Sequence, residues 1–248
     1  MTDLTILFIT ANRVPETWAA YHRRVLLEAA GDSLIITLSV KPTPIGLNIV
    51  QNEGYFSCVS NPDFPDPHLV DKKTGEYSGF YAQLLKGAKL ATTPYIAIAE
   101  DDTLYPKEHF AYRPALDTLA YNLGRWSLYT WGPPVYSYIG SMMGCAGIYP
   151  RKLAISMLEE RFTKFADKIP FKYFGELGRY EKYLKVTVHP VALFYSDPPI
   201  IQFNHDYFST IPNTEEYVKR RHKKRMGFLR ATNIPYWGES AELVRNFR

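Results

Sequence analysis

The stretch YIAIAEDDTLYP, residues 95–106, is an apolar run that leads directly into three consecutive carboxylates and then reaches a proline. A continuous apolar run of this length is typical of a strand buried on both faces of a parallel sheet. Such a strand delivers Glu100, Asp101 and Asp102 to its carboxyl end, where open α/β sheets bind their ligands. Three adjacent acids repel one another, so we expect a cation or a donor-rich ligand to balance them.

The chemistry of divalent cations offers one explanation for this charge. Mg²⁺ and Mn²⁺ suit carboxylate ligands, and Mg²⁺ is usually bound by one or two carboxylates together with substrate phosphates. The alternative is that the acids only cap a helix or mark the end of a strand. An apolar strand that runs into Glu-Asp-Asp, a turn and a proline favours a metal–diphosphate site over that alternative.

The residues before this stretch predict the rest of a nucleotide-binding type of half-domain. An apolar run at 4–10, a helical pattern at 16–32 and a second apolar run at 33–40 predict a βαβ unit with parallel strands. Residues 78–93 have a helical pattern and lead into the strand at 94–99. We therefore expect a Rossmann-like α/β fold with a mixed, mainly parallel central sheet flanked by helices.

The remaining segments are shorter and their patterns weaker. LNIVQN and FSCVSNP have weak strand character, and residues 61–79 are rich in Pro, Asp and Gly, which is typical of a surface loop. After Pro106 the sequence predicts four strands or extended segments and two helices: strands at 125–132, 135–142, 186–195 and 199–208, an amphipathic helix at 150–168, and a short helix at 175–185.

Composition excludes several classes of protein. Hydrophobic residues make up 46% of the 248 residues, which is enough for a sizeable core. The two cysteines, Cys58 and Cys145, do not support a disulfide scaffold or a cysteine-ligated zinc site. MTDLTILFIT lacks a basic region and predicts a first strand rather than a signal peptide. No window approaches the roughly 20 apolar residues of a membrane-spanning helix, so we expect a soluble, cytoplasmic protein.

Positive charge is concentrated near the C-terminus. The net charge is +4, yet residues 219–230 carry seven Lys or Arg and no acid, so the remainder, with 22 basic and 25 acidic residues, carries −3. Asn213 and Glu216 predict a capped helix start just before this segment. Its density of charge indicates an anionic partner, and the candidate anion-binding residues are Lys219, Arg220, Arg221, Lys223, Lys224 and Arg225.

Two segments resemble a known family. KGAKLATTPYIAIAEDDTLYP (86–106) and ILFITANRVPETW (6–18) resemble the signature segments of GT-A fold glycosyltransferases, particularly the large family 2. The resemblance implies a nucleotide diphospho-sugar donor, most often a UDP-sugar, and Mn²⁺ or Mg²⁺ as the cofactor. The first loop would contact the base or ribose, and its candidate residues are Thr10, Asn12 and Arg13.

The same resemblance assigns roles to the three acids. Glu100 would face the donor, Asp101 would help to bind it, and Asp102 would ligate the metal. The leading Glu departs from the commonest Asp-x-Asp-like pattern. In several such enzymes a His after the last core strands completes the metal shell, and IIQFNHDYFS places His205 there, with Asp206 as a substitute.

A further block, GSMMGCAGIYPRKLA (140–154), resembles the family's small-residue strand and helix start. The catalytic base is expected some 20–30 residues later, which indicates Glu176 in FGELGRYE. Leu177 replaces the second acid of the family's motif, so Glu181 is a rival for the same role. The alternative is that Glu176 only starts a helix and complements its dipole.

Together these features predict a metal-dependent glycosyltransferase of hexosyltransferase type. We expect a transferase domain at 1–210, divided into a nucleotide-sugar half at 1–106 and an acceptor and catalytic half at 107–210, followed by a basic helical extension at 211–248. With a base on the face opposite the leaving diphosphate, transfer inverts the anomeric centre.

The acceptor is predicted only as a class. A glycan or glycolipid fits, and so does a hydroxymethylated DNA base, the acceptor of some bacteriophage enzymes, which would imply DNA modification in a host cytoplasm. Trp131 is a candidate for stacking on sugars or bases. Two other functions remain open: a sugar-nucleotide nucleotidyltransferase, which the glycine-free loop after the first strand disfavours, and a non-catalytic nucleic-acid-binding domain.

Overall fold

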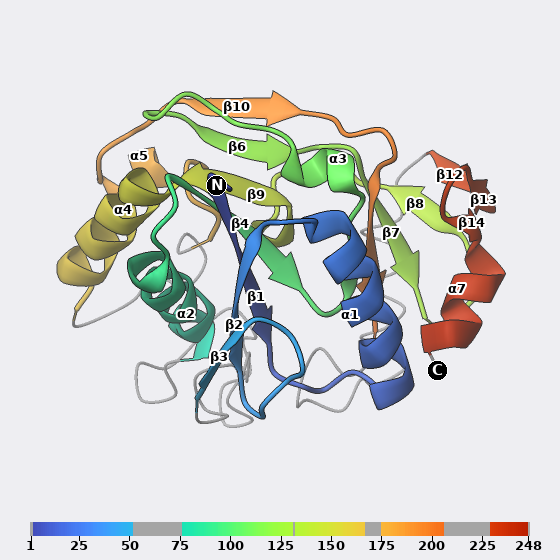
Figure 1. Cartoon of the computed structure of the whole chain (residues 1–248). Coiled ribbons are helices and arrows are strands. Elements are labelled where there is room, and N and C mark those ends of the chain that lie inside the picture. The colour runs from blue at the N-terminus through green and yellow to red at the C-terminus, as the bar shows by residue number, and fades with distance from the viewer. Residues whose placement is uncertain (1, 52–75, 131, 167–174, 206–228, 248) are drawn as a thin grey trace, which may run out of the picture.

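The computed structural model of the chain (Figure 1) describes residues 2–51, 76–130, 132–166, 175–205 and 229–247. Its centre is a seven-stranded sheet in the order β10-β6-β9-β4-β1-β2-β3. Strands β1 to β4 are mutually parallel, β10 is parallel to β6, and β9 runs antiparallel to both of its neighbours. The sheet consists of β1 (Leu4–Thr10), β2 (Leu34–Ser39), β3 (Leu47–Val50), β4 (Tyr95–Glu100), β6 (Leu119–Asn122), β9 (Gly147–Pro150) and β10 (Val191–Phe194).

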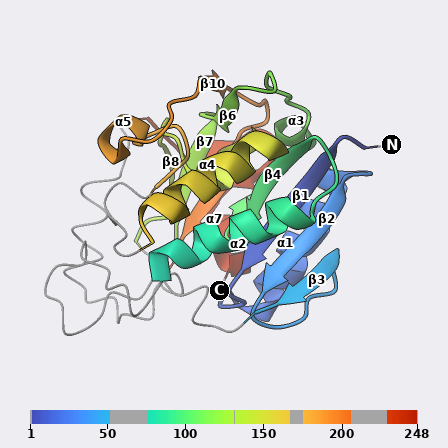
Figure 2. The ribbon, with the colours of Figure 1, turned by 90° about the vertical axis from the view of Figure 1, so that its left-hand side faces the viewer.

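Helices cover both faces of this sheet because its central strands are apolar on both faces. Side chains of successive strand residues point to opposite faces, so Ile6 and Phe8 pack with α1 (Glu16–Ala30) and α3 (Lys107–Phe110). Leu7 and Ile9 pack on the other face with two further helices, which Figure 2 shows side by side. These helices are α2 (Glu76–Leu90) and α4 (Arg151–Lys164). The predicted mixed, mainly parallel sheet flanked by helices is confirmed.

A second, five-stranded sheet lies beside the first in the order β12-β8-β7-β11-β5. Its strands are β5 (Thr103–Leu104), β7 (Arg125–Tyr129), β8 (Tyr136–Tyr138), β11 (Ile200–Asn204) and β12 (Arg230–Ala231). Only two residues, Asp101 and Asp102, separate the end of β4 from the start of β5. Glu100, Asp101 and Asp102 therefore form an acidic corner between the two sheets. The small hairpin of β13 (Asn233–Ile234) and β14 (Gly238–Glu239) leads into α7 (Ser240–Phe247), which packs on α1 and β7.

Most predicted elements of the first half are present, in the order β1-α1-β2-β3-α2-β4. The later half differs more. Strand β6 and the one-turn helix α3 were not predicted, and the helix predicted at 175–185 is only α5 (Glu181–Leu184). Its start is delayed because Gly178 has φ +85°, which a helix cannot contain. The strand predicted in FSCVSNP and the helix predicted from Asn213 lie outside the described residues.

The predicted boundary at residue 210 stays a prediction. Residues 230–247 contribute to a cluster that also contains Trp18 and Phe203, so this part of the chain packs on the same core as the strands. Among the described helices, none combines the length and the apolar character that crossing a membrane requires.

Candidate functional site

Side chains of α1 and β1 form hydrogen bonds with the acidic corner. Asp101 lies just past β4, and its backbone carbonyl accepts a hydrogen bond from the Trp18 indole at 2.8 Å. Two residues on, the Thr103 carbonyl is 2.9 Å from Nε2 of His22, a fully buried imidazole. The Thr10 hydroxyl, at the end of β1, donates to the Asp101 carboxylate. Side chains from β1 and α1 thus fix the corner on both sides of Asp102.

The adjacent strand β11 brings a histidine to Asp102. The backbone N–H of Phe203 donates to the Asp102 carbonyl at 2.7 Å, which aligns the end of β11 with the acidic corner. His205 follows directly after β11, and its Nε2 lies 3.6 Å from Oδ2 of Asp102. The other carboxylate oxygen, Oδ1, accepts a hydrogen bond from the Thr103 hydroxyl at 2.9 Å. Both side chains are buried, 8% and 5% exposed for Asp102 and His205.

The spacing of Asp102 and His205 suits two ligands of one divalent cation. Carboxylate oxygens and imidazole nitrogens lie about 2.1 Å from such an ion, so two ligands at octahedral or tetrahedral angles are about 3.0–3.4 Å apart. The 3.6 Å observed is close to that range. Within the described part of the chain, no group of three or more His, Cys, Asp or Glu side chains is arranged to hold a metal. A cation here would therefore need further ligands such as phosphate oxygens and water, as Mg²⁺ commonly has.

Glu100 is the most strongly perturbed acid of the corner. Burial raises the pKa of its carboxyl well above the usual value, and the charges of Asp102, Asp101 and Glu176 raise this pKa further. Glu176, which is far away in sequence, is thus one of the charges that act on this carboxyl. Arg125 opposes these effects and lowers the pKa of Glu100. Clusters of perturbed acids of this kind are typical of functional sites.

Arg125 is a site residue that the sequence analysis missed. It starts β7 in the second sheet and is only 2% exposed. Its guanidinium donates to Gln202 on β11 at 2.5 Å and to the Ser141 hydroxyl at 3.1 Å. A buried cation held by neutral partners can balance part of the negative charge of Glu100 and its neighbours. The signal was present, because RWSLY places an arginine at the start of an otherwise strand-like run.

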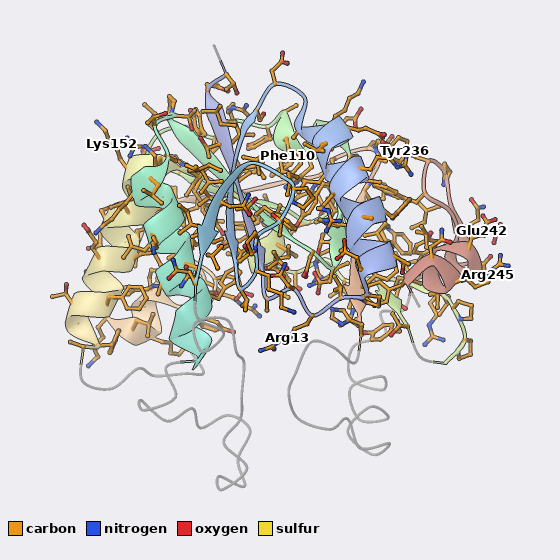
Figure 3. All side chains as sticks on the ribbon, turned by 60° about the horizontal axis from the view of Figure 1, so that its bottom comes forward. Arg13, Phe110, Lys152, Tyr236, Glu242 and Arg245 are labelled. Carbon is orange, nitrogen blue, oxygen red and sulfur yellow. The ribbon has the colours of Figure 1, made fainter. Side chains whose placement is uncertain are left out.

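The three residues predicted to bind the donor lie at the end of β1, which is Thr10, and in the loop after it, which contains Asn12 and Arg13. Asn12 has φ +54°, and its side-chain oxygen accepts the N–H groups of Val40 and Lys41 at 3.0 and 2.8 Å. The Asn12 side chain therefore joins the ends of β1 and β2. A pocket at this edge is lined in part by Thr10, Asn12 and Asp101. Arg13 lies at the same edge, where Figure 3 shows its side chain at the periphery of the molecule.

Glu176 lies in a turn closed by a hydrogen bond from the Arg179 N–H to its carbonyl at 3.2 Å. Its Oε2 accepts a hydrogen bond from Arg179 at 3.2 Å, and Arg179 also reaches the Met142 carbonyl at 3.4 Å. A Cβ on Gly144, two residues past Met142, would lie 3.7 Å from Oε1 of Glu100, so these segments are neighbours. The Glu176 side chain is 12% exposed, which leaves part of it accessible. The role of Glu176 as a base stays a prediction.

Glu181, the rival candidate, has a structural environment instead. Its carboxylate forms a buried ion pair with Arg161, whose side chain is 0% exposed, and accepts the Gly178 N–H at 2.7 Å. Arg161 also donates to the carbonyls of Gly175 and Glu176 at 2.7 and 3.3 Å. These contacts give the Glu181 carboxylate a structural role in the turn that carries Glu176. Its role as a rival base stays a prediction.

Removing the arginine from this buried pair should be costly. We expect Arg161→Met to lower the free energy of unfolding by about 3–5 kcal/mol, because the Glu181 charge is left buried without its partner. Urea denaturation monitored by tryptophan fluorescence measures the change. The matched control is Arg24→Met, which breaks an exposed ion pair with Glu28 and should cost less than about 1 kcal/mol. Equal losses in the two variants would contradict a structural role for the pair.

The acidic corner should also make stability depend on pH. Burial, with the nearby Asp102 charge, raises the pKa of Asp101 from 3.8 to about 6, although the Thr10 hydrogen bond opposes the shift. Since the folded state holds this proton more tightly than the unfolded state, the stabilisation is full below pH 3.8 and is lost as the pH rises through 6. The loss is about 2–3 kcal/mol.

Comparison with Asp101→Asn in metal-free buffer isolates this contribution. The free energy of unfolding of the wild type, relative to the variant, should fall between pH 4 and pH 7 and level off above. Urea denaturation at each pH provides the values. Parallel curves for the two proteins would show that Asp101 titrates normally.

Several predicted site residues cannot be compared with the structure. Trp131, Asp206 and the whole basic segment lie outside the described residues, so their roles stay predictions. Of the two cysteines, Cys145 is buried and unbonded, and Cys58 is outside the described residues.

Comparison with known proteins gives only distant similarities. No family model and no curated protein matches the sequence. The chain is similar to bifunctional IspDF from Campylobacter jejuni (9% identity, TM-score 0.39, covering 79% of this chain and 50% of that one). It is also similar to S. aureus TarS 1-349 in complex with UDP-GlcNAc (11% identity, TM-score 0.43, 88% and 64%).

A third similarity covers nearly all of both chains. It is to a protein from Desulfovibrio desulfuricans G20 assigned to the nucleotide-diphospho-sugar transferases (9% identity, TM-score 0.36, covering 91% of this chain and 97% of that one). By contrast, this chain spans only 50% and 64% of the length of the first two neighbours. Because the identities and TM-scores are this low, we base the function on this chain's own side chains.

Proposed function

We propose that this chain is a metal-dependent glycosyltransferase that moves a sugar from a nucleotide diphospho-sugar to a hydroxyl acceptor with inversion. The observation that carries the proposal is the pairing of Asp102 with His205 at 3.6 Å, at the corner where β4 leaves the main sheet. This corner lies beside the loop after β1, where Thr10 bonds to Asp101 and Asn12 joins two strand ends. A nucleotide bound at that loop would present its diphosphate to the acidic corner.

The two sides of the site have different chemical tasks. Asp102 and His205 would hold Mn²⁺ or Mg²⁺, which neutralises the charge that builds on the leaving diphosphate. Thr10, Asn12 and Arg13 are the residues that we assign to the nucleotide, and Glu100 and Asp101 face the donor. Glu100 shares its surroundings with Arg125, which limits the repulsion among the acids.

Glu176 is the residue that we assign to the acceptor. As the acceptor oxygen forms its bond to the anomeric carbon, the bond from that carbon to the diphosphate oxygen breaks, and the diphosphate leaves with the electron pair. The acceptor proton passes to the Glu176 carboxylate, which Arg179 contacts at 3.2 Å. We prefer Glu176 to Glu181 because the Glu181 carboxylate is buried in its pair with Arg161.

The acceptor class follows from the basic segment and stays a prediction. A glycan or glycolipid, or a hydroxymethylated DNA base, would be recognised by residues outside the described part of the chain. The same holds for the predicted stacking role of Trp131.

The proposal is tested with a panel of UDP-, GDP-, ADP-, CDP- and dTDP-sugars, each with and without Mn²⁺. We expect one nucleotide to raise the melting temperature only with Mn²⁺, and slow hydrolysis of that sugar nucleotide to release the nucleoside diphosphate. Release of pyrophosphate from a nucleoside triphosphate and a sugar phosphate would instead indicate a nucleotidyltransferase. Binding of DNA without any response to nucleotide or metal would favour the non-catalytic alternative.

A further inference from the structure

The C-terminal helix α7 presents one apolar face to the core. Leu243, Val244 and Phe247 are buried, at 4%, 5% and 1% exposed. Glu242 and Arg245 lie on the opposite face, and Figure 3 shows both at the outer side of the molecule. The spacing of the buried residues is that of a helix with a single inward stripe. Phe247 is therefore directed into the molecule, toward the second sheet.

The Phe247 ring lies among three aromatic side chains that belong to other elements. Its centroid is 4.8 Å from that of Trp18 on α1 and 5.0 Å from that of Phe203 on β11, with which it stacks at 11°. It is also 5.0 Å from the centroid of the His205 imidazole, at an interplanar angle of 40°. One ring from α7 thus contacts the candidate metal ligand and two of its supports.

Those two supports reach the acidic corner from different directions. Trp18 donates its indole N–H to the Asp101 carbonyl at 2.8 Å, and the Phe203 backbone N–H donates to the Asp102 carbonyl at 2.7 Å. Phe247 packs against both of these residues. Packing in a buried aromatic cluster restricts the position of each ring. A shift of α7 would therefore move Trp18 and Phe203, and with them the backbone of the acidic corner.

His205 lies beyond the regular pairing of the second sheet. The register of β11 with β7 ends at Asn204, one residue earlier, so the sheet ladder does not itself orient the imidazole. The ring lies with Asp102 at its Nε2, 3.6 Å away, and with Phe247 against it. Groups that pack against a ligating imidazole set its orientation and thereby affect metal affinity.

We propose that Phe247 is a positioning residue: its ring holds the His205 imidazole at the spacing from Asp102 that one divalent cation requires. This inference rests on the metal site proposed above. Under this proposal α7 affects the affinity for the metal, although it contains none of the proposed ligands. It does not make Phe247 a catalytic residue, because its ring contacts the proposed ligand and not the reacting groups.

The test is direct measurement of Mn²⁺ binding to the full chain without donor, from the free Mn²⁺ signal in electron paramagnetic resonance. We expect Phe247→Leu to raise the Kd for Mn²⁺ about tenfold, whereas Phe247→Tyr, which keeps the ring, should stay near wild type. Val244→Ala is the matched control, since Val244 is buried one turn earlier on the same face of α7. It should lower the melting temperature without changing the Kd.

The outcomes distinguish failure of the positioning role from failure of the proposed metal site. If the wild type binds Mn²⁺ and Asp102→Asn does not, but Phe247→Leu binds as the wild type does, the positioning role is wrong and the metal site stands. Equal weakening by Val244→Ala and Phe247→Leu would assign the effect to general loosening of α7, and would also overturn the positioning role. If the wild type binds Mn²⁺ only with the nucleotide that raises its melting temperature, the variants are compared in that nucleotide. Absence of Mn²⁺ binding by the wild type both without donor and with that nucleotide would overturn both proposals. Circular dichroism checks that each variant is folded. If Phe247→Leu is not folded, Phe247→Met takes its place.

Discussion

Asp102→Asn is expected to abolish Mn²⁺-dependent binding of the donor and to lower kcat/KM by about 10²–10³-fold, or about 3–4 kcal/mol. The substitution keeps the size of the side chain and an oxygen that can accept the 2.9 Å hydrogen bond from Thr103. It removes the negative charge that faces His205 at 3.6 Å. The loss would therefore come from the cation and not from the shape of the corner. Rates of nucleoside diphosphate release over a range of Mn²⁺ concentrations measure it.

The control for this variant is Asp117→Asn, which changes an exposed aspartate just before the start of β6. It should match the wild type in melting temperature, donor response and rate. Asp102→Asn should itself be folded and no less stable than the wild type, since it reduces repulsion among three acids. Full activity in Asp102→Asn would mean that the acids of the corner are structural and that the proposed metal site is wrong.

Glu176→Gln is the second large effect that we expect. Loss of the base should lower kcat by about 10²–10⁴-fold while donor affinity and Mn²⁺ affinity change little. The side chain keeps its size and its contact with Arg179, which is 3.2 Å from Oε2. Only the ability to accept a proton is lost. Steady-state kinetics with a saturating donor give kcat.

Glu159→Gln is the matched control, because Glu159 is an exposed carboxylate in an ion pair with Lys89. It should leave kcat unchanged. Glu181→Gln answers a different question: it should destabilise the fold through loss of the charge opposite Arg161, with any loss of rate following the loss of folded protein. A full rate in Glu176→Gln would exclude this residue as the base and leave the inverting mechanism without a proton acceptor.

The first half of the fold could be predicted because its signals are local. The apolar runs of β1, β2 and β4 are continuous, and α1 and α2 have long helical patterns between them. Each of these elements is long enough for periodicity to identify it. The acids at the end of β4 needed no contact information either, since a parallel strand in an open sheet carries its ligand-binding residues at its carboxyl end.

The second half was harder because its elements are short and carry buried polar residues. Strand β6 has four residues, and one of them, Asn122, is fully buried while bonding to Ser196 at 2.7 Å and to the Gly124 N–H at 2.7 Å. An asparagine in sequence indicates a turn more often than a central strand. Its burial is favourable because Ser196, which is distant in sequence, bonds to it in addition to the local Gly124 N–H.

The sequence by itself determined the mainly parallel α/β sheet and the delivery of Glu100, Asp101 and Asp102 to its edge, because both follow from patterns within single segments. The family resemblance predicted His205 and Asp102 as partners, and only the tertiary structure decided their 3.6 Å spacing and the effect of Arg125 on Glu100. It also decided that Glu181 is a buried partner of Arg161 while Glu176 remains accessible. Two glutamates five residues apart look alike in sequence. Their roles differ because burial and charge depend on what the rest of the chain packs around each carboxylate.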